Sequence, residues 1–507
     1  MRSLLGARLE YDPRRFSGYR RLGRLARDSR RVEPGDVFFA MPGASDDGRR
    51  HIAEADERGA ALVFYESGDG FAPPPLKRAQ GAPVANLREL SGLIASDLLG
   101  RPSQKLRCYG VTGTNGKTSV SQWLAQAEGA MGRKCAVVGT LGWGFPGSLR
   151  HSDRTTPDAA DLQQELADFV DLGAEAVAME VSSHALELAR VNGVAFDVAV
   201  FTNLSRDHLD FHGTMERYAQ AKLKLFAWEG LKGAAINGDD PVGRSYVERL
   251  AALRGSEGFG GFDPRVVTYG FGEESDVRVE SWEQGARSMS LSLATPWGRL
   301  AFASPTLGRF NAQNLAAAAS ALLLAGFAPS DVEAALARIR PAQGRMQIAH
   351  LDGPAGSAPL PTVVVDYAHT PDALEKTLQA LRPSAERSGG RLWAVFGCGG
   401  DRDPGKRPMM GRLATKLADE TVVTSDNPRF EDPLAIIDGV TQGGALSGSW
   451  RAIPDRAEAI AWAIAQADPR DVLLIAGKGH EDYQDAKGVK THFDDMEIAL
   501  RELGKRA

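Results

Sequence analysis

The sequence predicts an α/β protein of three domains in which largely parallel sheets are covered by helices. Short apolar runs alternate with helical patterns through most of the chain, which is typical of parallel strands buried on both faces. The chain has 507 residues, and at roughly 150 residues per domain this length suggests about three domains. Turn-rich stretches at 100–104 and 341–344 place the predicted domains at 1–104, 105–342 and 343–507.

The composition is that of an ordinary soluble globular protein, with 43% apolar and 25% charged residues. A formal net charge of -5 offers no basic field for nucleic acid or anionic lipid. No apolar run approaches the ~20 residues of a membrane span, so we expect a cytoplasmic protein. Cys108, Cys135 and Cys398 are too scattered for a disulfide framework and are expected to be buried thiols.

The first domain is predicted to be a small α/β unit. The segment 35–43 (GDVFFAMPG) reads as a strand that ends in a turn, and 51–67 (HIAEADERGAALVFYES) reads as a helix followed by a strand. Proline and glycine make the segment 70–83 (GFAPPPLKRAQGAP) turn-rich, so we expect it to be exposed.

The middle domain opens with the strongest local motif, an apolar strand, a glycine-rich loop and a helix (GVTGTNGKTS). Its glycines let backbone N–H groups surround a phosphate at a helix N-terminus, Lys117 can reach the terminal phosphates, and the Thr118 hydroxyl can hold Mg²⁺. Val111 stands where the common P-loop has glycine, so a plain strand-to-helix turn remains the alternative. The predicted nucleotide-binding residues of this P-loop-type sheet domain are Gly113, Thr114, Asn115, Gly116, Lys117, Thr118 and Ser119.

Further apolar runs in the middle domain end in polar residues. Glu180 ends one of these strands and could bind Mg²⁺, or it could be a cap. His208 and Lys222, read alone, are a structural hydrogen-bonding histidine and a surface lysine. The alternation in 288–305 predicts a β-ribbon, and 310–327 predicts a helix.

The C-terminal domain repeats the strand and helix alternation and is predicted to be a doubly wound, Rossmann-like sheet. Its polar motifs, DYAHTPD, SDNPR and GKGHED, follow apolar strands. Ligands of open α/β sheets bind at the carboxyl ends of the strands, so these motifs indicate a binding site.

Ten motifs in this order resemble the Mur ligase family from about Asp28 to Asp485: TGTNGKTS, TTPD, MEVSSHAL, FTNLSRDHLDFHG, YAQAK, GRFNAQN, DYAHTPD, GCGGDRDPGKRP, SDNPR and GKGHEDYQ. The resemblance implies an ATP- and Mg²⁺-dependent ligase of peptidoglycan precursor synthesis. It would add meso-2,6-diaminopimelate to UDP-N-acetylmuramoyl-L-alanyl-D-glutamate through an acyl phosphate, releasing ADP and phosphate. We expect a monomer whose substrates are small molecules.

The resemblance also implies roles for individual residues. The catalytic residues would be Lys117, His208 and Lys222. The metal-binding residues would be Thr118, Glu180, His208 and Lys222, the last as a carbamate. Further nucleotide contacts would come from Asn311, Arg345 and Asp366. The muramoyl substrate would meet Ser29, Thr155, Thr156, Ser182 and Arg190. The amino acid would meet Arg402, Asp426, Asn427, Pro428, Arg429, Gly477 and Glu481.

Two positions depart from the family pattern near the expected muramoyl site, namely Arg154 and Leu188. The choice of amino acid depends on Arg429, because in the family this arginine accompanies diaminopimelate, whose second carboxylate an arginine can bind with two hydrogen bonds. A lysine-adding relative, or another member of the Mur family, is one alternative. A P-loop switch that only hydrolyses nucleotide is another, although it would not need charged motifs in all three domains.

Overall fold

The computed structural model describes residues 23–43, 46–152, 154–253, 263–285, 288–351, 359–441, 446 and 448–506. They fall into two compact units. The first unit extends to Arg278 and includes Thr295–Gly298 and Ala316–Ala335, and the second comprises Val279–Ala294, Arg299–Leu315 and the chain from Leu336 onward. The predicted α/β architecture is confirmed, whereas the boundaries at 104 and 342 stay predictions.

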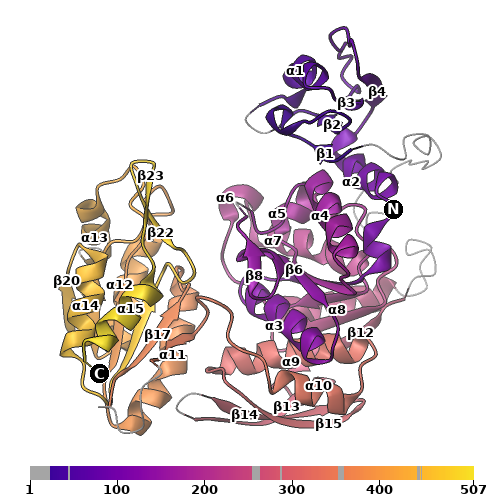
Figure 1. Cartoon of the computed structure of the whole chain (residues 1–507). Helices are drawn as coiled ribbons and strands as arrows, with labels where there is room; N and C mark the ends of the chain where they lie inside the picture. Colours follow the sequence, from indigo (N-terminus) through magenta and orange to yellow (C-terminus); the bar gives the residue numbers. More distant parts are fainter. Residues whose placement is uncertain are drawn as a thin grey trace. The chain divides into compact units, whose positions relative to one another are not determined.

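The first unit begins with a four-stranded parallel sheet in the order β1-β2-β3-β4 (Figure 1). Its elements are β1 (Leu25–Ala26), β2 (Val37–Ala40), α1 (Ile52–Glu57), β3 (Leu62–Glu66), β4 (Gln80–Val84) and α2 (Leu87–Leu98). The segment 70–83, which was expected to be turn-rich and exposed, ends in a strand that was not predicted, Gln80–Val84. Pro83 is tolerated there since β4 lies at the sheet edge, where a missing N–H breaks no ladder.

A larger sheet forms the centre of the first unit. Within the unit its strand order is β12-β11-β10-β5-β9-β6-β7-β8, and the strands from β12 to β6 are parallel. The strands are β5 (Arg107–Thr112), β6 (Cys135–Gly139), β7 (Gly142–Phe145), β8 (Ser148–Arg150), β9 (Ala176–Glu180), β10 (Val198–Phe201), β11 (Gly233–Asn237) and β12 (Arg265–Gly270). The helices are α3 (Lys117–Ala130), α4 (Ala159–Asp171), α5 (Ser183–Glu187), α6 (Leu209–His212), α7 (Met215–Leu223) and α8 (Pro241–Leu253).

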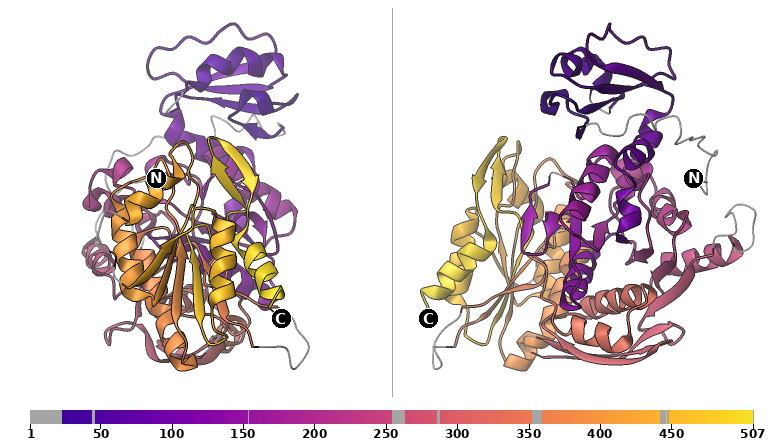
Figure 2. Two further views of the ribbon diagram at one scale, coloured as in Figure 1. Left: turned by 90° about the vertical axis from the view of Figure 1, so that its left-hand side faces the viewer. Right: turned by 45° about the vertical axis from the view of Figure 1, so that its right-hand side comes forward.

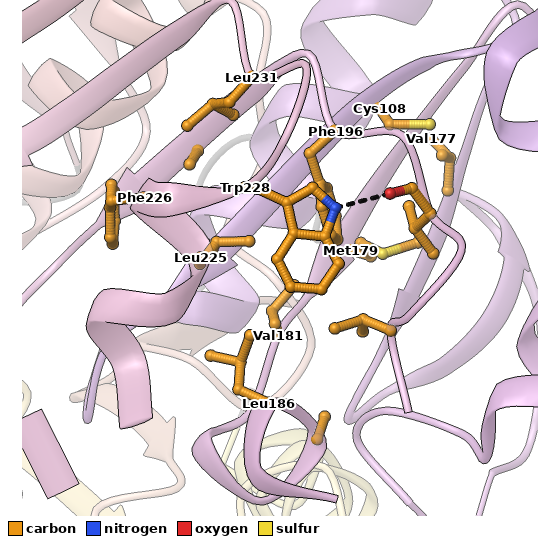
Figure 3. Packing of buried hydrophobic residues seen from close by; sticks show 14 of the residues in the cluster. Cys108, Val177, Met179, Val181, Leu186, Phe196, Leu225, Phe226, Trp228 and Leu231 are labelled. Atoms are coloured by element: carbon orange, nitrogen blue, oxygen red, sulfur yellow. Dashed lines mark hydrogen bonds between the residues drawn. The ribbon is translucent and has the colours of Figure 1, made fainter. Parts of the chain in front are cut away.

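Both faces of this sheet are buried, as the unbroken apolar strands predict. Cys108 of β5 points into a cluster with residues of α4, α5 and α8, whereas its neighbour Tyr109 points to the opposite face and donates a hydrogen bond to Glu128 of α3 (2.6 Å). In the first cluster the Trp228 indole donates to the Val194 carbonyl (2.7 Å; Figure 3), so its one polar atom is satisfied.

The predicted ribbon is present, with neighbouring strands in the order β15-β14-β13. These strands and the two helices that follow are β13 (Val277–Gln284), β14 (Met289–Thr295), β15 (Gly298–Ser304), α9 (Arg309–Leu324) and α10 (Pro329–Leu336). The helix predicted at 310–327 thus corresponds to α9.

The second unit contains a six-stranded sheet in the order β16-β17-β21-β18-β19-β20, parallel except for β16. The strands are β16 (Gln347–Ala349), β17 (Thr362–Asp366), β18 (Leu392–Phe396), β19 (Glu420–Val423), β20 (Ser449–Ala452) and β21 (Val472–Ala476), and β22 (Tyr483–Ala486) with β23 (Val489–His492) forms a separate hairpin. The helices are α11 (Pro371–Ser388), α12 (Lys406–Leu417), α13 (Pro433–Thr441), α14 (Arg456–Gln466) and α15 (Asp495–Gly504).

Alternate side chains of these strands face different helices. Val364 packs with α11, α12 and α13, whereas Val363 and Val365 pack with α14 and α15. Figure 2 shows the helices on both faces of the sheet. The carboxyl ends of the parallel strands are therefore left open for loops that can bind ligands.

The three cysteines are free and buried, as predicted. Burial raises the pKa of the Cys398 thiol to about 12 and that of Cys108 and Cys135 well above the ordinary value. Of the helices described, none combines the length and apolar character needed to cross a bilayer.

Candidate active site

The glycine-rich loop lies between β5 and α3, as predicted. Gly116 has a left-handed φ of +87° and directly precedes Lys117, the first residue of α3. Gly113 has a φ of +146°, and a Cβ there would come within 1.9 Å of Thr202 Oγ1. A side chain is thus excluded at Gly113 and disfavoured at Gly116, and such glycines before a helix N-terminus let backbone N–H groups bind phosphate.

Two lysines meet at this loop. Nζ of Lys117 donates to the carbonyls of Gly113 and Thr114, at 2.9 Å each, and Nζ of Lys222 from α7 donates to the same Gly113 carbonyl at 2.9 Å. Lys222 is only 1% exposed. Burial, followed by the nearby charge of Lys117, holds the pKa of Lys222 well below its ordinary value. The structure therefore brings these two predicted residues together, and Lys222 loses its proton more readily than an ordinary lysine.

Glu180 ends β9 with its carboxylate held in place. Oε1 accepts a hydrogen bond from the backbone N–H of Thr140 (2.8 Å), and Oε2 accepts one from its hydroxyl (3.2 Å). That hydroxyl lies 3.0 Å from Oγ1 of Thr155. A buried carboxylate at the end of a strand in the sheet that carries the phosphate loop suits Mg²⁺, which prefers oxygen ligands.

His208 precedes α6 with a left-handed φ of +52°. Burial lowers the pKa of its imidazole, and the charge of Lys117 lowers it further, so the neutral ring is favoured. Its ring packs against His184 at 4.8 Å between centroids. Within the described part of the chain no three His, Cys, Asp or Glu side chains form a metal-binding group.

Replacing Gly139 by Ala should disturb the Glu180 carboxylate. A Cβ at Gly139, in the neighbouring strand β6, would lie 2.3 Å from Oε1 of Glu180. We expect the Mg²⁺ concentration for half-maximal activity to rise about ten- to a hundredfold, as when a residue that orients a metal ligand is changed. Gly129→Ala is the control, because nothing lies within 4 Å of a Cβ there. An unchanged Mg²⁺ requirement in Gly139→Ala would argue against Glu180 as a ligand.

Three of the residues predicted for the muramoyl substrate lie together beside Glu180. Oγ1 of Thr156 donates to the Glu180 carbonyl (2.8 Å) and accepts from the Ser182 N–H (3.2 Å), and Arg190 donates to the Thr156 carbonyl (3.3 Å). Ser182 is also the N-cap of α5. Ser29 lies in the N-terminal sheet region, where its hydroxyl donates to Glu54 (2.6 Å).

Asp158 joins this cluster and was not predicted. It forms ion pairs with Arg27 (2.6 Å), Arg190 (3.2 Å) and Arg154. Burial alone would raise the pKa of Asp158, but these arginines hold it below the ordinary value. Arg154, which departs from the family pattern, is thus paired with this carboxylate. Asp158 stands in the TTPD motif, but only the fold brings Arg27 beside it.

The residues predicted for the amino acid lie in the second unit, in the loops that follow β18, β19 and β21. Arg429 has a left-handed φ of +50°. Its backbone N–H donates to the Asp485 carbonyl (2.9 Å), and its carbonyl accepts from the Lys487 N–H (2.6 Å). A Cβ on Gly399 would lie 3.0 Å from an Arg429 guanidinium nitrogen and 3.8 Å from Cγ of Arg402. The two predicted arginines are therefore neighbours.

Gly477 lies directly beside Asp426. It has a φ of +119°, and a Cβ there would lie 2.5 Å from Oδ2 of Asp426. Asn427 is buried and donates from Nδ2 to Oε2 of Glu481 (2.7 Å). Pro428 follows in the same loop. The predicted contacts Asp426, Asn427, Gly477 and Glu481 thus form one cluster.

A buried arginine holds both strand ends of this cluster. Arg456 of α14 is 1% exposed and binds both carboxylate oxygens of Asp495 at 2.7 Å. It also donates to the carbonyls of Ser425 (3.2 Å) and Ala476 (3.0 Å), which directly precede Asp426 and Gly477. Arg456 thereby links the two loops of the predicted amino-acid site.

The remaining predicted nucleotide contacts also belong to the second unit. Asp366 ends β17 and accepts a hydrogen bond from the Met346 N–H (2.7 Å), and burial raises the pKa of its carboxyl. The Arg345 guanidinium lies over the Tyr367 ring at 4.3 Å. Asn311 lies in the first turn of α9, and its side-chain amide donates to the carbonyl of Leu307, which precedes the helix (2.8 Å).

Comparison with known proteins identifies the family. Family models match residues 24–97 (Mur ligase family, catalytic domain), 111–322 (Mur ligase middle domain) and 344–479 (Mur ligase, glutamate ligase domain). A UDP-N-acetylmuramoyl-L-alanyl-D-glutamate--2,6-diaminopimelate ligase of Chromobacterium violaceum is 51% identical, with 100% of both chains covered, and one of Pseudomonas aeruginosa is 49% identical, with 94% of both covered.

Solved structures agree. A ligase structure of the same name has a TM-score of 0.68 and 37% identity, covering 95% of this chain and 94% of that one. A MurF ligase of Thermotoga maritima in complex with ADP shares the fold, with a TM-score of 0.61, 21% identity, and coverage of 96% and 98%.

The phosphate loop, the strand-end clusters and these matches define an ATP-dependent ligase that forms amide bonds. The chain belongs to the Mur ligase family.

Proposed function

We propose that this ligase joins meso-2,6-diaminopimelate to UDP-N-acetylmuramoyl-L-alanyl-D-glutamate in peptidoglycan precursor synthesis. The relatives with this name cover nearly the whole chain at 46–51% identity, which supports the same reaction here. We further propose that it works in the cytoplasm, where ATP is available, and as a monomer.

The reaction has two steps. The γ-carboxylate of the substrate's D-glutamate attacks the γ-phosphorus of ATP, which releases ADP and leaves an acyl phosphate. The amine of diaminopimelate then attacks the acyl carbon, loses a proton and displaces phosphate. The first step brings an anion to a polyanion, so the site must offset negative charge.

In this proposal the residues around the phosphate loop offset that charge. Lys117 leaves the loop carbonyls that it now contacts and binds the terminal phosphates. Thr118, Glu180 and His208 would hold Mg²⁺, which supplies positive charge at the phosphates. As an amine, Lys222 donates a hydrogen bond to the loop and offers Mg²⁺ no oxygen, the ligand atom that this ion prefers. Addition of its neutral nitrogen to CO₂, with loss of one proton, would give a carbamate whose oxygens can bind the metal.

The observation that carries the choice of amino acid is the pair of arginines beside Gly399. Arg402 and Arg429 lie within reach of one another, and Asn427 with Glu481 lies in the adjoining loop cluster. Diaminopimelate has a carboxylate and an amine at each end, whereas lysine lacks the second carboxylate. Two arginines, with the Glu481 carboxylate in the adjoining cluster, would suit such an end group.

The test is ADP release by the full chain with ATP, Mg²⁺ and the muramoyl dipeptide, comparing meso-diaminopimelate with L-lysine. We expect release with diaminopimelate. Arg429→Ala should raise the KM for diaminopimelate about a hundredfold and leave the KM for ATP the same, because the second carboxylate of diaminopimelate loses its charged partner. Arg451→Ala is the control, since Arg451 is an exposed arginine over Trp462 in the same unit.

Two other results would distinguish an error in the choice of amino acid from an error in the choice of muramoyl substrate. Preference for lysine would mean that the role given to Arg429 is wrong while the ligase reaction stands. Absence of release with either amino acid would mean that the muramoyl dipeptide is not the substrate.

A further inference from the structure

Lys478 is a fully buried lysine to which no role has been assigned above. It follows β21 and lies between Gly477 and Gly479, and its side chain is 0% exposed. Its ammonium donates to Oδ1 of Asn427 (3.0 Å) and to Oε2 of Glu481 (3.2 Å). Burying a lysine is costly unless the charge is paired and hydrogen-bonded, so both contacts are needed to hold it there.

The Lys478 contact fixes which way the Asn427 amide points. Oδ1 of Asn427 accepts two hydrogen bonds, from Nζ of Lys478 and from the Asp485 N–H (3.0 Å). Nδ2 therefore faces the other way and donates to Oε2 of Glu481 (2.7 Å). An amide rotated by half a turn would set its NH₂ group against two donors, so Lys478 excludes that orientation.

Lys478 also determines which oxygen of Glu481 is available. Both hydrogen bonds to the carboxylate end on Oε2, and within the described residues no hydrogen bond reaches Oε1. Burial raises the pKa of Glu481, and the charge of Lys478 opposes that rise. The lysine thus helps to keep the carboxylate charged and in one orientation.

We propose that Lys478 is a positioning residue of the amino-acid site, which rests on the function proposed above. By holding Oδ1 of Asn427 and Oε2 of Glu481, it presents Oε1 of Glu481 as the acceptor for an amine of the incoming amino acid. Lys478 does not itself contact the substrate in this scheme and acts through its two partners.

The test measures KM for meso-diaminopimelate, ATP and the muramoyl dipeptide separately in Lys478→Met. We expect the KM for diaminopimelate to rise about tenfold or more, since a buried carboxylate and an amide each lose a donor. The other two KM values should stay within about twofold, because the fold and the phosphate loop are unchanged. Lys478→Arg, which keeps the charge, should recover part of the loss. Lys490→Met is the matched control. Both Lys478 and Lys490 lie over the Tyr483 ring, but Lys490 is exposed.

A double variant separates positioning from a loss of stability. Lys478→Met combined with Glu481→Gln should have a KM for diaminopimelate close to that of Glu481→Gln alone. Lys478 acts through Glu481, so its loss adds little once the Glu481 carboxylate is gone. Additive losses, or equal rises in all three KM values, would overturn the inference, and so would an unchanged KM in Lys478→Met. If Lys478→Met fails to fold, Lys478→Arg and Glu481→Gln decide by the same comparison. A wild-type chain that releases no ADP with diaminopimelate would overturn the proposed function, and this inference with it.

Discussion

Replacing Lys222 by Met is expected to lower kcat on the order of a thousandfold, the scale of losing a group that stabilises the charged transition state. Met fills a similar volume in this buried position but can neither donate to the Gly113 carbonyl nor become a carbamate. The measurement is ADP release at saturating concentrations of all substrates. A ¹³C signal from labelled bicarbonate should appear in the wild-type chain and be absent from the variant.

Lys224→Met is the matched control for this change. Lys224 follows Lys222 by two residues but is partly exposed and pairs with Glu187 at 2.9 Å. Its loss should leave kcat within about twofold, as is usual for exposed ion pairs. A Lys222→Met variant that keeps most of its kcat would rule out a metal-binding carbamate at this position.

Replacing Arg456 by Met should lower the free energy of unfolding of the second unit by about 3–5 kcal/mol, because Asp495 would be left as a buried, unpaired charge. The two side chains are 0% exposed. The loss is measured by denaturant unfolding of the full chain, with a spectroscopic probe in the second unit as the readout. We also expect a higher KM for the amino acid, because the carbonyls of Ser425 and Ala476 lose the hydrogen-bond donor that they share.

Arg470→Met provides the comparison, since Arg470 is largely exposed and pairs with Asp468 at the surface. That change should leave the free energy of unfolding nearly unchanged. Adding Asp495→Leu to Arg456→Met should recover part of the stability, because the unpaired charge is removed. Equal losses for Arg456→Met and Arg470→Met would show that the buried pair contributes no more than a surface pair.

Much of the fold could be predicted because its strands are apolar runs buried on both faces. The strand before Gly113 and the strands that end at Glu180 and Asp366 were identified in this way. β4 was missed because its sequence, QGAPV, has no strand pattern of its own. It is a strand only because β3 offers it hydrogen-bonding partners along one edge.

The candidate site was predicted unevenly. The phosphate loop is local in sequence, so its residues could be named from glycine spacing and the following Lys117. Lys222 could not be distinguished from a surface lysine by periodicity, because its burial results from the approach of α7 to Gly113, which lies 109 residues earlier. For the same reason neither the arginines around Asp158 nor the network of Lys478 could be predicted, and the family resemblance was needed to select Lys222. The roles of all these residues stay predictions.

The buried cysteines have a practical consequence. Cys108 and Cys135 lie on β5 and β6 of the first unit's sheet, one on each side of β9, and Cys398 follows a strand of the second unit. A thiol that is both shielded and held in its protonated form does not react with alkylating reagents until the surrounding sheet opens. The native chain therefore carries an intrinsic reporter of local opening in each unit, and the modified cysteine identifies which unit opened.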